Sequence, residues 1–144
     1  MAVQRWFNCS PEQVFAVLQD GWTYPVWVVG ASRMRDVDES WPAPGTKLHH
    51  SFGVWPLVID DSTEVLEIEA DRRLVLEARG WPVGKARVEI NVKSDGDGSL
   101  VSIAEDVSGG PARFVPESVR VAGIDMRNRE TLRRLAYLAE GHDH

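Results

Sequence analysis

The pattern of hydrophobic and polar residues divides the chain into a short opening strand and helix, a long strand-rich middle and one closing helix. Residues 2–8 read as a strand, and Ser10-Pro11-Glu12-Gln13 is a typical helix start, with Ser10 as N-cap and Gln13 able to bond back to it. Gly21 is expected to stop this first helix. One or two further helical turns are expected within residues 22–29, bent at Pro25.

The middle of the chain predicts a series of antiparallel strands. Alternation of apolar and polar side chains between turns places them at residues 32–38, 46–54, 57–69, 74–79, 87–93 and 100–107, the third long enough to be bent or bulged. Residues 41–45 form a rigid turn, and residues 95–98 form a hairpin turn. The connections are too short for crossover helices, so neighbouring strands should be antiparallel.

A long amphipathic helix is expected from about Pro116 to about Glu140. One stripe of its surface carries Val121, Ile124, Asp125, Asn128, Leu132, Leu135 and Ala139, whereas Arg127, Arg133 and Arg134 fall off it. Asp125 and Asn128 face the sheet, so they need partners or a wet cavity. A single helix cannot cover so many strands flatly, so the sheet should curl around it and enclose a hollow.

Length and composition indicate one ordinary globular domain over residues 1–144, with a frayed tail at residues 141–144. The formal net charge of −6 opposes binding to nucleic acid, which requires clustered positive charge. We find no signal peptide and no run of about 18 apolar residues, so no integral membrane segment is expected and a cytoplasmic location is predicted.

The cysteine and histidines give little support for metal or covalent chemistry. Cys9 is the only cysteine, and without a nearby histidine it is interpreted as an apolar filler rather than a reactive thiolate. His49 and His50 are adjacent in a strand and therefore point to opposite faces, so they cannot share a metal ion. The sequence predicts no metal and no cofactor.

Three segments, Cys9-Ser10-Pro11-Glu12-Gln13-Val14-Phe15, Trp41-Pro42-Ala43-Pro44-Gly45-Thr46 and the run from Arg127 to Leu135, resemble the START-like polyketide cyclase/dehydrase and lipid-transport superfamily (SRPBCC). The likeness is to its small bacterial members of unassigned function. It implies an α+β helix-grip fold, in which a curved seven-stranded antiparallel sheet grips the C-terminal helix, two short helices close one end, and an apolar cavity lies inside.

Side chains alternate between the two faces of a strand, and this alternation identifies the candidate acid and base groups. His50 shares a face with Leu48 and Phe52, and Glu105 continues a row of inward apolar residues. If His50, Glu105 and Asp125 converge, they could catalyse enolisation or dehydration of a polyketone. Alternatively His50 is hydrogen-bonded within the fold, and Glu105 is turned to solvent by a bulge or paired with an arginine.

The expected ligand-binding set adds aromatic groups near the cavity mouth. It comprises Tyr24, Trp27, His50, Phe52, Trp55, Glu105, Ile124, Asp125 and Asn128. Cyclases of the superfamily often hold polyketide oxygens with a cavity arginine, whereas Arg79 and Arg87 here should face solvent. The first hypothesis is therefore binding or transport of a small hydrophobic ligand such as a lipid, sterol or polyketide. Alternatives are a cyclase or dehydratase, and a protein-interaction module; a monomer or homodimer is expected.

Overall fold

The computed structural model describes residues 2–28, 31–52, 59–80, 84–109, 114 and 116–141. Its strands are β1 (Ala2–Phe7), β2 (Ala31–Val37), β3 (Lys47–Phe52), β4 (Ile59–Glu69), β5 (Arg73–Gly80), β6 (Gly84–Asp95) and β7 (Gly98–Gly109). Its helices are α1 (Pro11–Gln19), the 3-10 turn η1 (Gly21–Thr23), α2 (Tyr24–Trp27) and α3 (Glu117–Ala139). The predicted order of elements is confirmed.

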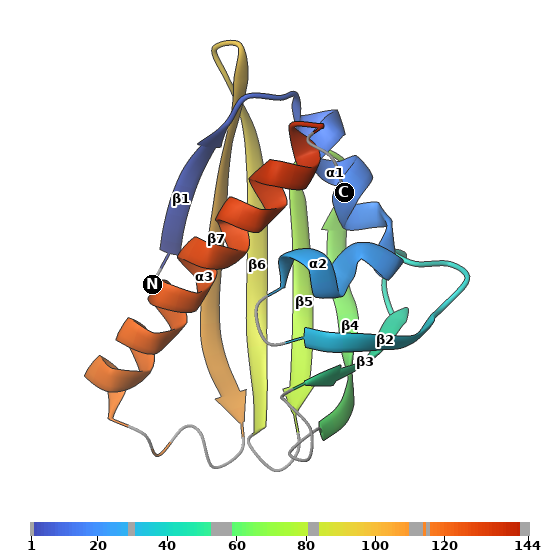
Figure 1. Cartoon of the computed structure of the whole chain (residues 1–144). Helices are drawn as coiled ribbons and strands as arrows, with labels where there is room; N and C mark the ends of the chain where they lie inside the picture. Colours follow the sequence, from blue (N-terminus) through green and yellow to red (C-terminus); the bar gives the residue numbers. More distant parts are fainter. Residues whose placement is uncertain are drawn as a thin grey trace.

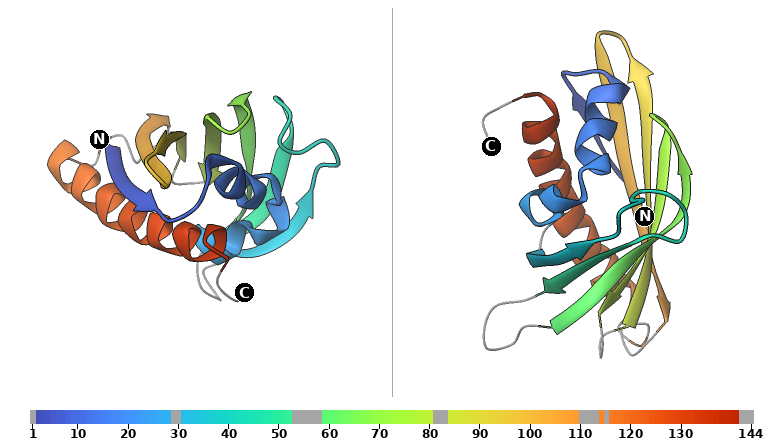
Figure 2. Two further views of the ribbon diagram at one scale, coloured as in Figure 1. Left: turned by 90° about the horizontal axis from the view of Figure 1, so that it is seen from above. Right: turned by 90° about the vertical axis from the view of Figure 1, so that its right-hand side faces the viewer.

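The seven strands form one antiparallel sheet in the order β1-β7-β6-β5-β4-β3-β2. The sheet curves, and α1, α2 and α3 all lie on its concave side (Figures 1 and 2). This is the helix-grip arrangement expected from the resemblance. The concave face of the sheet is therefore the face that the helices cover.

Local signals in the sequence account for the element boundaries. The Gln13 backbone N–H donates to Ser10 Oγ at 3.3 Å and the Ser10 N–H donates to Gln13 Oε1 at 3.0 Å, which completes the predicted capping box of α1. The long strand β4 contains the expected irregularity, between Val65 and Glu67. Gly141 follows α3 with a φ of 83°, a left-handed conformation that glycine adopts without steric cost.

Gly21 has a different role from the one predicted. The helix α1 already ends at Gln19, and Asp20 caps it. A Cβ atom at Gly21 would lie 2.5 Å from Leu48 Cδ2, so the absence of a side chain allows η1 to pack directly on β3. The glycine is explained by close packing and not by helix termination.

The hydrophobic core lies between the sheet, α1 and the second half of α3. Its largest fully buried side chains are Phe7, Phe15, Leu48, Leu74, Ile90, Ile103, Leu132 and Leu135. The Trp41 indole donates to the Leu18 carbonyl at 3.2 Å, which attaches the turn before β3 to α1. No helix in the described ranges is long and apolar enough to cross a bilayer.

Candidate functional site

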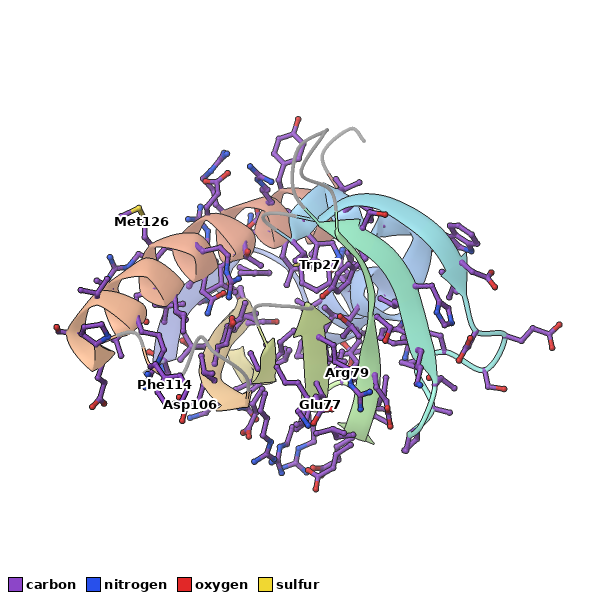
Figure 3. The ribbon with its side chains drawn as sticks, turned by 90° about the horizontal axis from the view of Figure 1, so that it is seen from below. Trp27, Glu77, Arg79, Asp106, Phe114 and Met126 are labelled. Atoms are coloured by element: carbon purple, nitrogen blue, oxygen red, sulfur yellow. The ribbon has the colours of Figure 1, made fainter. Side chains whose placement is uncertain are left out.

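An inner cavity of about 60 Å³ lies between α2, α3 and strands β4 to β7. Its wall is mainly apolar, with Leu76, Val88, Ile90 and Ile103 contributed by the sheet. Tyr24 and Trp27 border it from α2, and Asn128 and Thr131 border it from α3. Figure 3 shows Trp27 between the sheet and α3. The cavity therefore combines a mainly apolar wall with a few polar groups from β4, β7 and α3.

Tyr24 and Trp27 form an aromatic corner of this cavity. Their ring centroids lie 5.3 Å apart and their planes are inclined by 69°, the edge-to-face arrangement that aromatic pairs favour. The Tyr24 hydroxyl is 3.2 Å from Thr63 Oγ1. Burial, above all other causes, raises the pKa of Tyr24 to about 12. The phenol is therefore neutral near pH 7 and is not a general base.

The indole of Trp27 presents an unusual buried donor. Trp27 is only 4% exposed, and its Nε1 is buried with no hydrogen-bond acceptor among the described residues. Two other tryptophans have acceptors, since Trp6 Nε1 donates to the Asp95 carbonyl at 3.1 Å and Trp41 Nε1 to that of Leu18 at 3.2 Å. Buried indole N–H groups usually have a partner, so Trp27 stands out.

Glu105 forms the polar end of the inner cavity. Its side chain is 8% exposed, and it accepts hydrogen bonds from Arg127 Nη2 at Oε2 and from Asn128 Nδ2 at Oε1, the latter at 3.3 Å. Of the alternatives for Glu105, pairing with an arginine is the one found. The carboxylate is compensated by a guanidinium and an amide, which hold it in one orientation.

Arg127 was not expected in this cluster, because it falls outside the apolar stripe of the closing helix. Its side chain is 38% exposed and nevertheless reaches Glu105, since a long arginine side chain can extend from the edge of a buried stripe. Arg127 is one helical turn before Thr131, which is buried and also borders the cavity. The structure explains its position, and no pattern in the sequence indicates it.

An outer cleft of about 270 Å³ adjoins the first half of α3. Arg120, Ile124 and Asp125 line it from the helix, and charged residues of β6 and β7, including Arg87 and Asp106, line it from the sheet. Asp125 Oδ1 is buried without a hydrogen-bond partner among the described residues. Of the two polar helix residues predicted to face the sheet, Asn128 thus has a partner, whereas Asp125 borders a cleft.

Glu105 belongs to the walls of both the inner cavity and the outer cleft. Its ion pair with Arg127 consequently lies where the two spaces approach each other. Asp125 and Glu105 share the outer cleft, so two of the three predicted catalytic candidates line one space. The third, His50, pairs through its backbone with Asp61 in the sheet, and its side chain lies outside the described part of the structure.

The remaining predicted site residues divide as follows. Tyr24, Trp27 and Asn128 border the inner cavity, whereas Ile124 borders the outer cleft. The side chain of Phe52 and the whole of Trp55 lie outside the described residues. Thr63 and Thr131 border the cavity and were not predicted, because neither belongs to an inward pattern that the sequence makes evident.

Arg79, Glu77 and Cys9 are not among the residues that line the inner cavity or the outer cleft. Arg79 donates to Glu77 at 2.9 Å, and both lie on the side of the sheet away from α3 (Figure 3). Burial, and secondarily the charge of Glu140, raises the pKa of Cys9 to about 11, which supports its interpretation as an inert filler. Among the described residues, no three His, Cys, Asp or Glu side chains are placed to hold a metal ion.

Comparison with known protein families gives a match for almost the whole chain. Residues 1–140 match the sequence profile of a family described as polyketide cyclase / dehydrase and lipid transport. A search of proteins of curated function finds no match.

Solved structures share the fold at low sequence identity. Protein CV1439 from Chromobacterium violaceum superposes with a TM-score of 0.72 at 20% identity, over 97% of this chain and 96% of that one. Ara h 8.0201 gives a TM-score of 0.72 at 12% identity, over 96% and 95%. The di-domain ARO/CYC StfQ from the steffimycin biosynthetic pathway gives 0.75 at 9% identity, over 97% of this chain and 50% of that one. At these identities the likeness establishes the fold.

Proposed function

The chain belongs to the polyketide cyclase / dehydrase and lipid transport family, and from this premise we propose that it binds a small hydrophobic ligand in the inner cavity. The observation that carries the proposal is the composition of the cavity wall. Apolar side chains from strands β5, β6 and β7 face α2 and α3 across the cavity, and a few polar groups lie among them. Ligand sites typically combine apolar walls with a few polar groups that orient the ligand.

The size of the cavity restricts the ligand. A volume of about 60 Å³ is well below the roughly 300–1,000 Å³ of sites for drug-sized molecules. A molecule of one ring or a short chain suits this space, whereas a sterol or a long acyl chain would require α2 or α3 to move. Compact ligands therefore come first in any binding panel.

A cyclase or dehydratase remains the second candidate, with the outer cleft as its site. The observation in its favour is that Asp125 and Glu105 line the same cleft and that Asp125 Oδ1 has no partner among the described residues. Against it, Glu105 is held by Arg127 and Asn128, and Tyr24 is neutral. These groups can orient a ligand more readily than they can exchange protons with it.

Thermal unfolding with a ligand panel tests the proposal, because a ligand that binds only the folded state raises the melting temperature. The panel contains single-ring aromatics, short fatty acids and a sterol. We expect compact members to raise the melting temperature, and larger members to have less effect. Failure of every member to raise it would contradict ligand binding.

Two variants determine which space holds the ligand. Ala78→Leu adds volume to the wall of the inner cavity, and Ala104→Leu makes the same change in the wall of the outer cleft. We expect Ala78→Leu to abolish the ligand-induced rise and Ala104→Leu to keep it. The reverse result would move the site to the outer cleft and favour the catalytic candidate. Circular dichroism of both variants checks that the fold is retained.

A further inference from the structure

We propose that Trp27 selects the ligand, and that the inner cavity takes a compact, neutral molecule whose carbonyl or ether oxygen accepts a hydrogen bond from Trp27 Nε1. The inference rests on the proposed function and adds to it a specificity residue and a ligand chemistry. Three observations carry it: an unpaired donor on a residue that lines the cavity, internal compensation of the cavity's charges, and the cavity's size.

The first observation is the indole of Trp27. Its N–H group is buried without an acceptor among the described residues, and Trp27 is one of the residues that line the inner cavity. Because Nε1 itself has almost no accessible surface, the indole has to turn slightly for a ligand oxygen to reach it. A buried donor without an acceptor is costly, and a ligand oxygen that supplied the acceptor would recover this cost on binding. The exposed Trp6 and the part-buried Trp41 already donate to backbone carbonyls, so they offer no such gain.

The second observation is the charge balance of the cavity wall. Arg127 and Glu105 are the charged residues of this wall among those described, and they are bonded to each other. Their pairing leaves no uncompensated charge to attract a carboxylate or an ammonium group, and burying an unpaired charge is expensive. A neutral oxygen therefore fits the site better than an ionised one.

The third observation is the limited room beside the aromatic corner. Trp27 and Tyr24 meet edge to face, and the cavity measures about 60 Å³. A flat ring can pack against these side chains, while its carbonyl group reaches the indole. The ligand expected on these grounds is a single-ring ketone or a molecule of similar size.

Two probes of nearly the same shape test the inference. Acetophenone carries a carbonyl oxygen, and α-methylstyrene has a methylene group in its place. Their dissociation constants are measured by titration on the wild type, on Trp27→Phe and on Trp6→Phe. Trp6→Phe removes an indole that does not border the cavity and serves as the matched control.

Because the hydrocarbon is intrinsically more hydrophobic, the quantity of interest is the ratio of the two dissociation constants. We expect Trp27→Phe to shift this ratio about five- to tenfold against acetophenone, as loss of one hydrogen bond implies, and Trp6→Phe to leave it unchanged. In ¹⁵N-correlated NMR spectra, acetophenone should move the Trp27 indole proton downfield and α-methylstyrene should not.

The outcomes separate the inference from the proposed function. If both probes bind, but Trp27→Phe leaves the ratio of their dissociation constants unchanged and acetophenone does not move the Trp27 indole proton of the wild type, the role of Trp27 is wrong and ligand binding stands. If neither probe, nor any member of the wider panel, binds the wild type, the proposed function fails and the inference fails with it. A ratio that shifts equally in Trp6→Phe would also overturn the assignment to Trp27.

Discussion

The two halves of α3 have the same backbone conformation and very different surroundings. None of residues 117–127 is fully buried, whereas residues 128–139 include Asn128, Thr131, Leu132, Leu135, Ala136, Leu138 and Ala139 in the buried class. The first half lines the outer cleft with Arg120, Ile124 and Asp125. The second half packs on the core. In Figure 1 the first turns of α3 extend past β1 at the edge of the sheet.

The difference shows how one helix can both stabilise the fold and border a cleft. Apolar burial concentrated in the second half stabilises the domain, so the first half is free to carry polar groups. Arg127 and Asn128 lie at the boundary and hold Glu105 there. On the outward side of α3, Met126 is 71% exposed and lies away from the sheet (Figure 3).

The largest expected effect on the free energy of unfolding tests the contrast between the two halves of α3 directly. Leu135 is completely buried, so Leu135→Ala should lower the free energy of unfolding by about 2–5 kcal/mol through lost contacts and a new cavity. Ile124 is only partly buried, and Ile124→Ala should cost less than about 1 kcal/mol. Urea denaturation measures both, and equal costs would contradict the division of α3.

At the boundary, Arg127→Met should lower the free energy of unfolding by about 2–3 kcal/mol. The substitution leaves the buried Glu105 carboxylate with Asn128 alone, although the partial exposure of Arg127 lets water relieve some of the penalty. Arg129→Met, on the exposed side of the same helix, is the control and should cost less than about 0.5 kcal/mol. A double variant that also carries Glu105→Gln should recover much of the loss in the same urea experiment.

The neutral phenol of Tyr24, which borders the inner cavity, predicts a loss of stability at alkaline pH. Its pKa is raised to about 12 in the folded protein, whereas an unfolded tyrosine titrates near 10. Above pH 10 the unfolded state releases this proton first, so stability should fall by on the order of 2 kcal/mol as pH rises toward 12. Urea midpoints from pH 9 to 11 should fall less steeply in Tyr24→Phe than in the wild type.

Tyr137→Phe provides the control for this pH experiment. Tyr137 is half exposed on α3 and does not border the cavity. Its replacement should leave the alkaline slope as in the wild type. If Tyr24→Phe and Tyr137→Phe had the same slope, the burial of the Tyr24 hydroxyl would not be the cause.

The smallest effect compares Asp125 and Asn128, the two polar residues of α3 that the sequence predicted to face the sheet. Asp125→Ala removes a carboxylate oxygen without a partner among the described residues and introduces a better helix former, so stability should rise by about 0.5 kcal/mol. Asn128→Ala removes a donor to Glu105 and should lower stability by about 1 kcal/mol. Thermal unfolding gives the sign of each change, and two changes of the same sign would contradict the contrast.

Much of the fold could be predicted because its signals are local. The Ser10–Gln13 capping box and the alternation within the strands each depend on neighbouring residues. The contacts within the site could not be predicted in the same way. The alternation of side chains along the strand placed Glu105 inward. Its pairing with Arg127, however, joins residues 22 positions apart and depends on how far a long side chain can extend.

The sequence by itself determined the order of strands and helices, the family, and the inward stripe of α3, because each follows from short-range patterns and recognisable motifs. Only the tertiary structure decided that the interior divides into an inner cavity and an outer cleft, that Asn128 is paired while Asp125 Oδ1 is not, and that Trp27 Nε1 is buried without an acceptor among the described residues. The physical reason is that cavities and hydrogen-bond partners arise where distant segments meet, and side-chain packing sets those distances.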